Sequence, residues 1–328
     1  QKHFDYARQI GIQNLERKPD SNSHLLWIEA LFGLGQSRIC SEEIIDLLNL
    51  KKKYSPNKLI SIDVPVGLNS DNGNIGLKAS CSASSTLTVG LFKSGLIQDS
   101  AIDFVGDLEK VDIGIPKNIL SDFQVSNPLR LSFSDLSTFD WPKQNKNKSK
   151  YQRGRVLVVA GSEKYKGAAS LALSGALASG VGSVSALLPK SVSSSLWQTH
   201  SEALFVGDLN TLADGVSGFS IVWDEVDLNR YDSILIGPGL GIAKEKDCFS
   251  SALKGFKGLL VLDADAINRL SLTSKGWKWL NDRNGPTWLT PNTSEFKRLF
   301  PLIDGSHPLK AAIEAAKISG SSVLLKCA

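Results

Sequence analysis

Several features that would assign a protein to a specialised class are missing from this sequence. Its four cysteines, Cys40, Cys81, Cys248 and Cys327, are far apart and form no Cys-x-x-Cys pair. This spacing argues against a zinc site or a disulfide framework and favours a reducing compartment. No apolar run reaches about 18 residues, and no signal peptide opens the chain. We therefore expect a cytoplasmic protein that has no membrane partner.

Methionine is absent altogether, so the chain contains no initiator residue. The chain also stops at Ala328, directly after the apolar run 322–325. A sheet protein seldom ends one step past a core strand, because such a strand serves to position the next segment of the chain. We interpret the sequence as an internal fragment that lacks both ends of its protein. The alternative is a processed N-terminus together with a short natural C-terminus.

The charge balance also lacks a strong bias. A formal net charge of +4 over 328 residues is mild and does not by itself imply a nucleic-acid or membrane partner. The one basic stretch, 141–150, has no aromatic residues among its lysines, which favours an exposed linker over a nucleic-acid patch. The length favours two domains. We place a first domain at 1–125, a linker at 126–150 and a second domain at 151–328.

The pattern of apolar runs and breakers predicts two α/β domains. In the first domain, strands are expected at 58–64, 85–91 and 108–113 and a helix at 42–53, while the apolar run 25–32 ends in a glycine-rich loop. In the second, strands are expected at 155–160, 183–188, 219–223, 232–236, 258–263, 286–290 and 322–325, with helices that include 168–181 and 308–318. Such alternation is typical of a mostly parallel sheet. The small residues Ala168, Ala172, Gly175 and Ala178 are expected to let their helix pack close to the sheet.

Two strings in the first domain are candidates for ligand contacts. Gly33 and Gly35 follow an apolar run and precede Arg38, a weak phosphate-loop signal because glycine permits close backbone approach and arginine suits phosphate. A tight strand-to-helix turn explains the same glycines. Asp63 lies near the carboxyl end of a buried strand, at the edge where open α/β sheets bind ligands. Its carboxylate suits a sugar hydroxyl, a cation or proton transfer, and the alternative is a helix cap or turn.

Together with Thr88-Val-Gly-Leu-Phe-Lys-Ser-Gly-Leu96 and Val111-Asp-Ile-Gly-Ile-Pro116, these strings resemble the NAD(P)H-hydrate epimerase family over residues 1 to about 120. The resemblance implies a Rossmann-like α/β/α sandwich, a substrate-binding and proton-transferring Asp63, and a potassium ion near Glu29 and Val66. It also implies contacts to the substrate phosphates from Gly33, Leu34, Gly35, Gln36, Ser37, Arg38 and Ile39. Glu29 and Val66 depart from the family's usual Asp and Ser, and its Asn-Asn-Gly-Gly-Asp-Gly loop is absent.

The second domain carries polar groups at successive strand ends. Gly167 and Ala168 open a helix whose N-terminus suits an anion, although plain strand–loop–helix geometry explains them equally. The string Gly237-Pro-Gly-Leu-Gly241 is not a dinucleotide fingerprint, because its glycines are spaced G-x-G-x-G. Asp263-Ala-Asp265 and Thr290-Pro-Asn-Thr-Ser-Glu-Phe-Lys-Arg298 follow further strands. Lone carboxylates there are often caps, but a series at one sheet edge favours a binding site.

This series resembles the ADP- or ATP-dependent NAD(P)H-hydrate dehydratases, a branch of the ribokinase-like fold, over about residues 148–328, as in the fused epimerase–dehydratase proteins of bacteria. The resemblance implies that the hydrated nicotinamide substrate is lined by Ala168, Gly239, Asn292, Thr293, Ser294, Glu295, Phe296, Lys297 and Arg298. It implies a nucleotide-binding segment formed by Lys326, Cys327 and Ala328, in which the family usually has glycine at the middle position. The family's Gly-x-Gly-Asp loop, which supplies its catalytic Asp, is absent.

The resemblance therefore implies a repair enzyme for hydrated NADH and NADPH that epimerises the R and S hydrates and dehydrates the S hydrate. The expected cofactors are K⁺, Mg²⁺ and ADP or ATP as co-substrate. The expected partners are small molecules, with no nucleic acid, and a homo-oligomer is expected. The fragment alone is expected to be impaired. The alternatives are a ribokinase-like small-molecule kinase and a non-catalytic binding or scaffold protein, since fold alone does not separate these functions.

Overall fold

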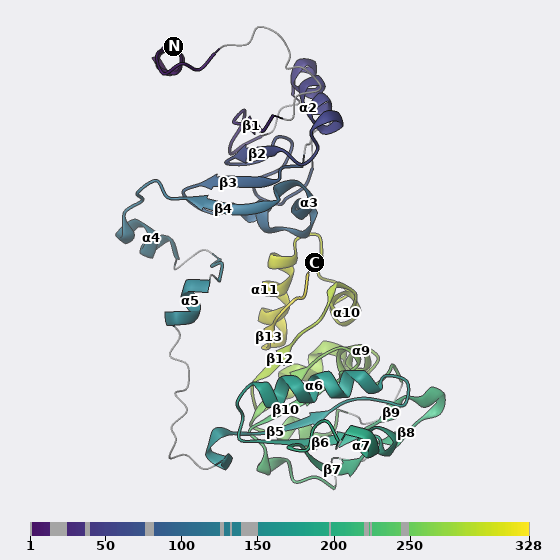
Figure 1. Ribbon diagram of the computed structural model, residues 1–328. Coiled ribbons are helices and arrows are strands. Elements are labelled where there is room, and N and C mark those ends of the chain that lie inside the picture. Colours follow the sequence, from purple (N-terminus) through teal and green to yellow (C-terminus); the bar gives the residue numbers. More distant parts are fainter. Residues whose placement is uncertain are drawn as a thin grey trace. The chain divides into compact units, whose positions relative to one another are not determined.

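The computed structural model places most of the chain in two compact units, Gln1–Ser137 and Thr138–Ala328 (Figure 1). The described residues are 2–13, 25–36, 40–75, 82–124, 128–131, 133–138, 150–196, 198–219, 223, 225–243 and 249–327. The division between the units falls within the segment 126–150 that the sequence marks as a linker. The exact domain boundaries stay a prediction.

Unit 1 is built on a four-stranded parallel sheet of order β1-β2-β3-β4. Its strands are β1 (Trp27–Glu29), β2 (Leu59–Ile62), β3 (Ser85–Val89) and β4 (Asp107–Val111). Its helices are α1 (Lys2–Gln9), α2 (Glu42–Tyr54), α3 (Ile102–Val105), α4 (Lys117–Gln124) and α5 (Phe133–Thr138). Helix α2 buries Leu48 against Leu59 of β2, so the apolar stripe of 42–53 forms the expected amphipathic helix.

Strand β2 ends earlier than the apolar run 58–64 predicts. Asp63, the residue after Ile62, has a φ of 73°, which belongs to the left-handed region and turns the chain out of the sheet. Val64 beyond it is buried, but in a loop and not in the strand. The turn leaves the Asp63 side chain at the carboxyl edge of the sheet.

Unit 2 is built on a seven-stranded parallel sheet of order β13-β12-β11-β10-β5-β6-β7. Its strands are β5 (Arg155–Val159), β6 (Ser183–Leu188), β7 (Leu204–Asp208), β10 (Ser233–Ile236), β11 (Leu259–Leu262), β12 (Thr287–Leu289) and β13 (Ser322–Val323), and β8 (Asn210–Thr211) pairs antiparallel with β9 (Ser217–Gly218). Its helices are α6 (Lys166–Ala178), α7 (Lys190–Leu196), α8 (Ser251–Gly255), α9 (Asp265–Ser271), α10 (Thr293–Leu299) and α11 (Pro308–Ser319). The expected α/β fold with parallel sheets is confirmed in both units.

Short 3₁₀ segments complete the described chain. They are η1 (Ser94–Ile97), η2 (Asp99–Ala101), η3 (Lys150–Arg153), η4 (Ala213–Gly215), η6 (Leu228–Arg230) and η7 (Gly276–Asp282). None of the helices within the described ranges combines the length and apolar character that crossing a bilayer would require.

The two faces of the unit 2 sheet are covered to different extents. One face packs with α8, α9, α10 and α11 into a large core that includes Leu260 and Leu289. On the other face, α6 packs on β5 and β6 (Figure 1). Leu235, Val261 and Trp288 stand side by side on this second face, because their strands are paired in register. Trp288 is 48% exposed, so this strip of the sheet is the less covered part.

Unit 2 departs from the sequence-based expectations in several places. At the ends of the expected strand 219–223, Phe219 lies in a loop within an aromatic cluster and Trp223 lies in a 3₁₀ turn, while 220–222 lie outside the described residues. The expected small face of α6 packs only in part: Ala172 packs against the core cluster that contains Ala169 and Leu173, whereas Gly175 and Ala178 are exposed. Strand β7 was not expected, although the apolar run Ala203-Leu204-Phe205-Val206 covers its first half; it is an edge strand whose alternate residues are exposed.

Candidate active sites at two sheet edges

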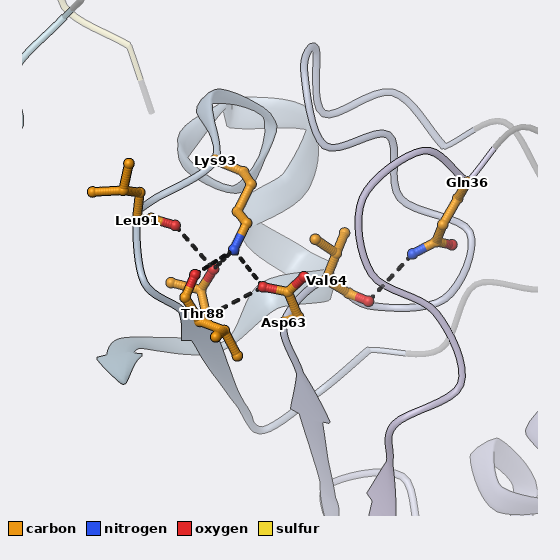
Figure 2. Close-up of polar contacts among 7 residues, drawn as sticks. Gln36, Asp63, Val64, Thr88, Leu91 and Lys93 are labelled. Atoms are coloured by element: carbon orange, nitrogen blue, oxygen red, sulfur yellow. Dashed lines mark hydrogen bonds and ion pairs between the residues drawn. The ribbon is translucent and has the colours of Figure 1, made fainter. Parts of the chain in front are cut away.

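Asp63 lies at the carboxyl end of β2 and is held by groups from the segment after β3. Its Oδ1 accepts a hydrogen bond from the backbone N of Val89 (3.1 Å) and an ion-paired one from Nζ of Lys93. Figure 2 shows that Lys93 also reaches Thr88, with Nζ donating to Oγ1 at 3.0 Å and to the Val89 carbonyl at 2.8 Å. The Lys93 side chain is only 10% exposed and that of Asp63 20%. The carboxylate therefore has a fixed position and a buried cationic partner.

The predicted glycine loop meets this carboxylate. A Cβ placed on Gly33 would lie 2.8 Å from Oδ2 of Asp63, so only glycine leaves the carboxylate in place. Leu34 and Gly35 form the following turn, and Gly35 has a φ of 80°. The structure thus brings together Gly33 and Asp63, two residues that the sequence placed in separate motifs.

Gln36, a predicted phosphate contact, is engaged with the protein. Its Nε2 donates to the carbonyls of Val64 (3.3 Å) and Pro65 (3.2 Å), and its Oε1 accepts from the backbone N of Gly67 (2.9 Å; Figure 2 shows the bond to Val64). This side chain ties the loop after β1 to the loop after β2. The next three predicted contacts, Ser37, Arg38 and Ile39, lie outside the described residues.

Glu29, a predicted potassium ligand, is buried at the end of β1. Its Oε1 accepts from Oγ of Ser61 (2.7 Å) and from the backbone N of Val66 (2.9 Å), while its Oε2 is buried without a described hydrogen-bond partner. Burial raises the pKa of this carboxyl group, and the hydrogen bonds from Ser61 and Val66 oppose the rise. An unpaired buried carboxylate oxygen fits a hard cation, which prefers oxygen ligands. Within the described ranges, no three His, Cys, Asp or Glu side chains gather as a metal site.

A second carboxylate, Asp263, lies at the carboxyl end of β11 in unit 2. Its Oδ1 accepts from Oγ1 of Thr290 (2.8 Å) and from Nζ of Lys326 (2.7 Å), a residue predicted to bind nucleotide. The following residue, Ala264, has a φ of 47°, a strained value for alanine of the kind that gathers at functional sites. The Lys326 side chain is 46% exposed and therefore accessible to a ligand. Cys327 is also exposed, and Ala328 lies outside the described residues.

A cavity of about 650 Å³ borders Asp263. Its wall includes Ala168 from α6 and Gly239 from the loop after β10, two residues that the sequence predicts to line the substrate. They touch closely, since a Cβ on Gly239 would lie 2.6 Å from Cβ of Ala168. The volume is in the range of small-molecule sites, roughly 300–1,000 Å³. The remaining wall is mostly apolar and includes Leu235 and Val261.

The predicted segment from Asn292 to Arg298 forms the start and body of α10. Asn292 caps the helix: its Oδ1 accepts from the backbone N of Glu295 (2.9 Å), whose carboxylate accepts from the Asn292 backbone in return. Phe296 is buried in the core, and Arg298 donates to Oδ1 of Asn268 (2.7 Å). Thr293, Ser294 and Lys297 are exposed. None of this segment lines the cavity, and its contact with substrate stays a prediction.

Lys93 and Asp263 received no role in the sequence-based prediction. Lys93 lies in the Thr88–Leu96 motif, just after a predicted strand. That position could have indicated a role at the sheet edge, although most such lysines are solvated. Asp263 was seen only as one of a series of polar strand ends. Both became functional candidates through partners 30 and 63 positions away.

The fold and these sites define a two-unit α/β enzyme whose parallel sheets each present a carboxylate–lysine pair at the ligand-binding edge. Residues 156–328, more than half of the chain, match the family described as NAD(P)H-hydrate dehydratase, and residues 1–95 match the family described as YjeF-related protein N-terminus. The chain belongs to the NAD(P)H-hydrate dehydratase family. The expected resemblance to a fused repair enzyme is confirmed.

Several curated relatives match almost the whole chain. The Bifunctional NAD(P)H-hydrate repair enzyme Nnr of Synechocystis sp. is 34% identical over 331 residues, which span 99% of this chain and 61% of the relative. The corresponding enzyme of Gloeobacter violaceus is 32% identical, over 99% of this chain and 63% of the relative. The chain thus spans about three-fifths of the length of these relatives.

Solved structures resemble part of the chain. The ADP/ATP-dependent NAD(P)H-hydrate dehydratase from Bacillus subtilis, co-crystallised with ATP/Mg²⁺, is 25% identical and covers 57% of this chain and 62% of its own, with a TM-score of 0.44. A ribokinase-like superfamily protein from Enterococcus faecalis V583 is 22% identical and covers 61% and 69%, with a TM-score of 0.47.

Proposed function

We propose that the full-length protein repairs hydrated NADH and NADPH, with unit 1 interconverting the R and S hydrates and unit 2 dehydrating the S hydrate at the expense of ADP or ATP. The observation that carries the proposal is the cavity in which Ala168, Gly239 and Asp263 meet, inside the region that matches the dehydratase family. The order of the two matched regions in the chain is the order expected for a fused repair enzyme.

In unit 2, the hydrated ring carries a hydroxyl group that leaves poorly as hydroxide. Transfer of a phosphoryl group from ADP or ATP to this oxygen releases AMP or ADP and the hydroxyl proton and makes a phosphate ester. Loss of phosphate from this ring carbon and of a proton from the adjacent ring carbon then re-forms the double bond. Lys326 is accessible and supplies a positive charge for the phosphates, while Asp263 offers a carboxylate for Mg²⁺. Mg²⁺ would offset the phosphate charge. The small residues Ala168 and Gly239 line the cavity, which supports close approach of the ring there.

In unit 1, Asp63 would move the proton that epimer exchange requires, and the contact from Lys93, which holds its carboxylate in one orientation, supports this role. The loop at Gly33 brings backbone close to this carboxylate, so the substrate phosphates would meet backbone amides there. Glu29 and the backbone of Val66 would hold K⁺, which supplies positive charge beside the substrate. The unpaired Oε2 of Glu29 supports this assignment.

The test is recovery of NADH from a mixture of both hydrate epimers by the full-length protein, with ADP and ATP supplied in turn. Full recovery supports both activities and names the donor. Recovery that stalls with one epimer left supports the dehydratase and contradicts the epimerase. No recovery with either nucleotide contradicts the proposal and favours a small-molecule kinase or a binding protein. A cytoplasmic location and a homo-oligomer stay predictions.

A further inference from the structure

Arg269 is the largest fully buried side chain in the described chain, only 1% exposed on helix α9. Its Nε donates to the carbonyl of Gly241 (2.8 Å), and one terminal nitrogen donates to the carbonyls of Ser217 (2.6 Å) and Leu240 (3.1 Å). The guanidinium also lies over the ring of Phe219, 5.2 Å from its centroid. Burying a cation costs several kcal/mol, roughly, unless its donors are satisfied. Hydrogen bonds to the three carbonyls offset that cost. The buried Arg269 therefore holds the backbone segments that carry these carbonyls.

The same helix also holds the other polar group of Gly241. Oδ2 of Asp265 accepts from the Gly241 backbone N at 2.7 Å. Asp265 and Arg269 are four positions apart and therefore lie on one face of α9. Helix α9 thus fixes the N–H and the C=O of a single loop residue. A Cβ on Gly241 would lie 2.3 Å from Cγ1 of Val216, so the fit around this residue is close.

The loop that Arg269 holds forms part of the cavity wall. Pro238 and Gly239, which precede Leu240 and Gly241, line the cavity, whereas Arg269 does not. The Pro238 carbonyl accepts from the backbone N of Gly161 (2.8 Å), in the loop after β5. Ser217 joins the same assembly, since its Oγ donates to the Gly161 carbonyl (2.8 Å) and its backbone N to the Leu240 carbonyl (2.8 Å).

We propose that Arg269 is a positioning residue, which fixes the loop 237–241 so that Gly239 stands beside Ala168 at the cavity wall. It acts through the loop backbone and does not touch the substrate. The identity of the ligand rests on the proposed function, but the effect of Arg269 on the loop does not.

Lysine is expected to fail in this position. The guanidinium presents its donors as a planar fork, and the lysine ammonium is a compact point charge that cannot reach three carbonyls on two segments in the same geometry. Substitution by lysine therefore keeps the charge and most of the volume while it removes the fork. Arg269→Lys is the informative variant, because Arg269→Leu also changes the core.

Arg283 is a matched control in the same unit. It also donates to backbone carbonyls, those of Leu253, Gly258 (3.1 Å) and Pro286 (3.3 Å), and burial lowers its pKa to about 10. Gly258 and Pro286 precede β11 and β12, so Arg283 lies at the amino ends of these strands, whereas the loop 237–241 follows the carboxyl end of β10. Its replacement removes the same kind of interaction without touching the loop 237–241.

The experiment compares Arg269→Lys and Arg283→Lys in the full-length protein. The first readout is hydrogen exchange of the peptide that spans 237–243, followed by mass spectrometry, together with the melting temperature. Arg269→Lys is expected to speed exchange of the Leu240 and Gly241 amides by about tenfold or more, because local opening becomes easier. Arg283→Lys is expected to lower the melting temperature without changing exchange in this peptide.

The second readout separates KM from kcat for the hydrated substrate. Arg269→Lys is expected to raise KM by about tenfold to a hundredfold with a smaller change in kcat, since a wall displaced by an ångström weakens binding. Unchanged exchange at 237–243 overturns the proposal, as does an equal change in Arg283→Lys. If the parent protein recovers no NADH, the proposed function fails, and the exchange measurement still decides the role of Arg269.

Discussion

The two units repeat one local arrangement at the edge of a parallel sheet. Asp63 follows β2 directly and Asp263 follows β11 directly, and each carboxylate pairs with a lysine, Lys93 or Lys326. At this point the chain turns through a left-handed residue in both units, Asp63 itself in one and Ala264 in the other. The surrounding sequences differ, so the likeness comes from the geometry of a parallel strand end.

The difference lies in how far each lysine is withdrawn from water. Lys93 is 10% exposed and donates to three acceptors, whereas Lys326 is 46% exposed. A buried pair holds its carboxylate in one geometry, and an exposed pair is weak enough to exchange its partner for a ligand phosphate. This difference fits the proposed proton transfer at a fixed carboxylate in unit 1 and the proposed binding of an anionic co-substrate in unit 2.

The strongest way to break this comparison is to neutralise the fixed carboxylate. Asp63→Asn in the full-length protein is expected to slow epimer interconversion by about 10²–10⁴-fold, the usual contribution of a positioned acid or base. Dehydration of the S hydrate is expected to stay unchanged, and both rates are followed by NADH recovery. Asp103→Asn, on the exposed side of α3, is the control. Normal epimer exchange in Asp63→Asn would remove Asp63 from the mechanism.

Close backbone approach offers a second comparison. A Cβ on Gly237 would lie 1.7 Å from the Asp263 carbonyl oxygen, at a φ of 132°, so Gly237→Ala is expected to cost roughly 3 kcal/mol or more of unit 2 stability. Gly33→Ala meets only a side-chain oxygen and is expected to cost about 1–2 kcal/mol in unit 1. Urea unfolding measures both. Gly255→Ala, with nothing within 4 Å, is the control and should be neutral or stabilising. Equal losses in all three variants would contradict the geometry.

Replacing each lysine tests whether its exposure to water sets its contribution to stability. Lys93→Met is expected to destabilise unit 1 by about 2 kcal/mol, because Asp63 and two further acceptors lose a buried charged donor. Lys326→Met is expected to change unit 2 by less than about 1 kcal/mol, as exposed pairs do, while it raises the KM for the nucleotide. Chemical denaturation and nucleotide titration provide the two measurements. The reverse ranking would show that exposure does not separate the sites.

The smallest expected effect is a pH dependence confined to unit 1. Burial raises the pKa of Glu29 above its ordinary 4.5, so the folded state binds a proton that the unfolded state releases. The stabilisation that this proton gives is fully present below the pKa that Glu29 has in the unfolded state. It is lost as the pH rises through the pKa that Glu29 has in the folded state. Glu29→Gln is expected to flatten this decline in melting scans from about pH 4 upward. If K⁺ occupies the site, KCl should stabilise the parent protein at higher pH more than NaCl does. Identical profiles for parent and variant would contradict the burial argument.

The sequence was sufficient for most strands and for the edge at which the site residues lie. Short apolar runs predicted β2, β5, β10 and β11, the first three of which are closed by proline or glycine, and parallel pairing then places Asp63 and Asp263 at carboxyl ends. Ala168 and Gly239 were predicted separately and meet at one cavity. These features depend on local pattern and on the rule that parallel strands share one edge.

The roles of Lys93, Gln36 and Arg269 were not predictable in the same way. A charged or amide side chain in sequence is most often solvated, and only the fold shows that Gln36 joins two loops or that Arg269 reaches Ser217, 52 positions away. The packing face of α6 was predicted only in part, for a related reason. Small residues pack closely against a sheet, but they also line a cavity, and periodicity alone does not tell which face turns inward.

The half-exposed indole of Trp288 gives the less covered strip of unit 2 an optical signature. Water beside an indole ring shifts its fluorescence to longer wavelength, so Trp288 should emit at longer wavelength than a buried tryptophan. The chain has six other tryptophans, which include the buried Trp223 and Trp279. The difference spectrum between the parent and Trp288→Phe therefore isolates the hydration of Leu235, Val261 and their neighbours. Salts that strengthen apolar contacts should move that difference spectrum toward the blue if molecules associate through this strip.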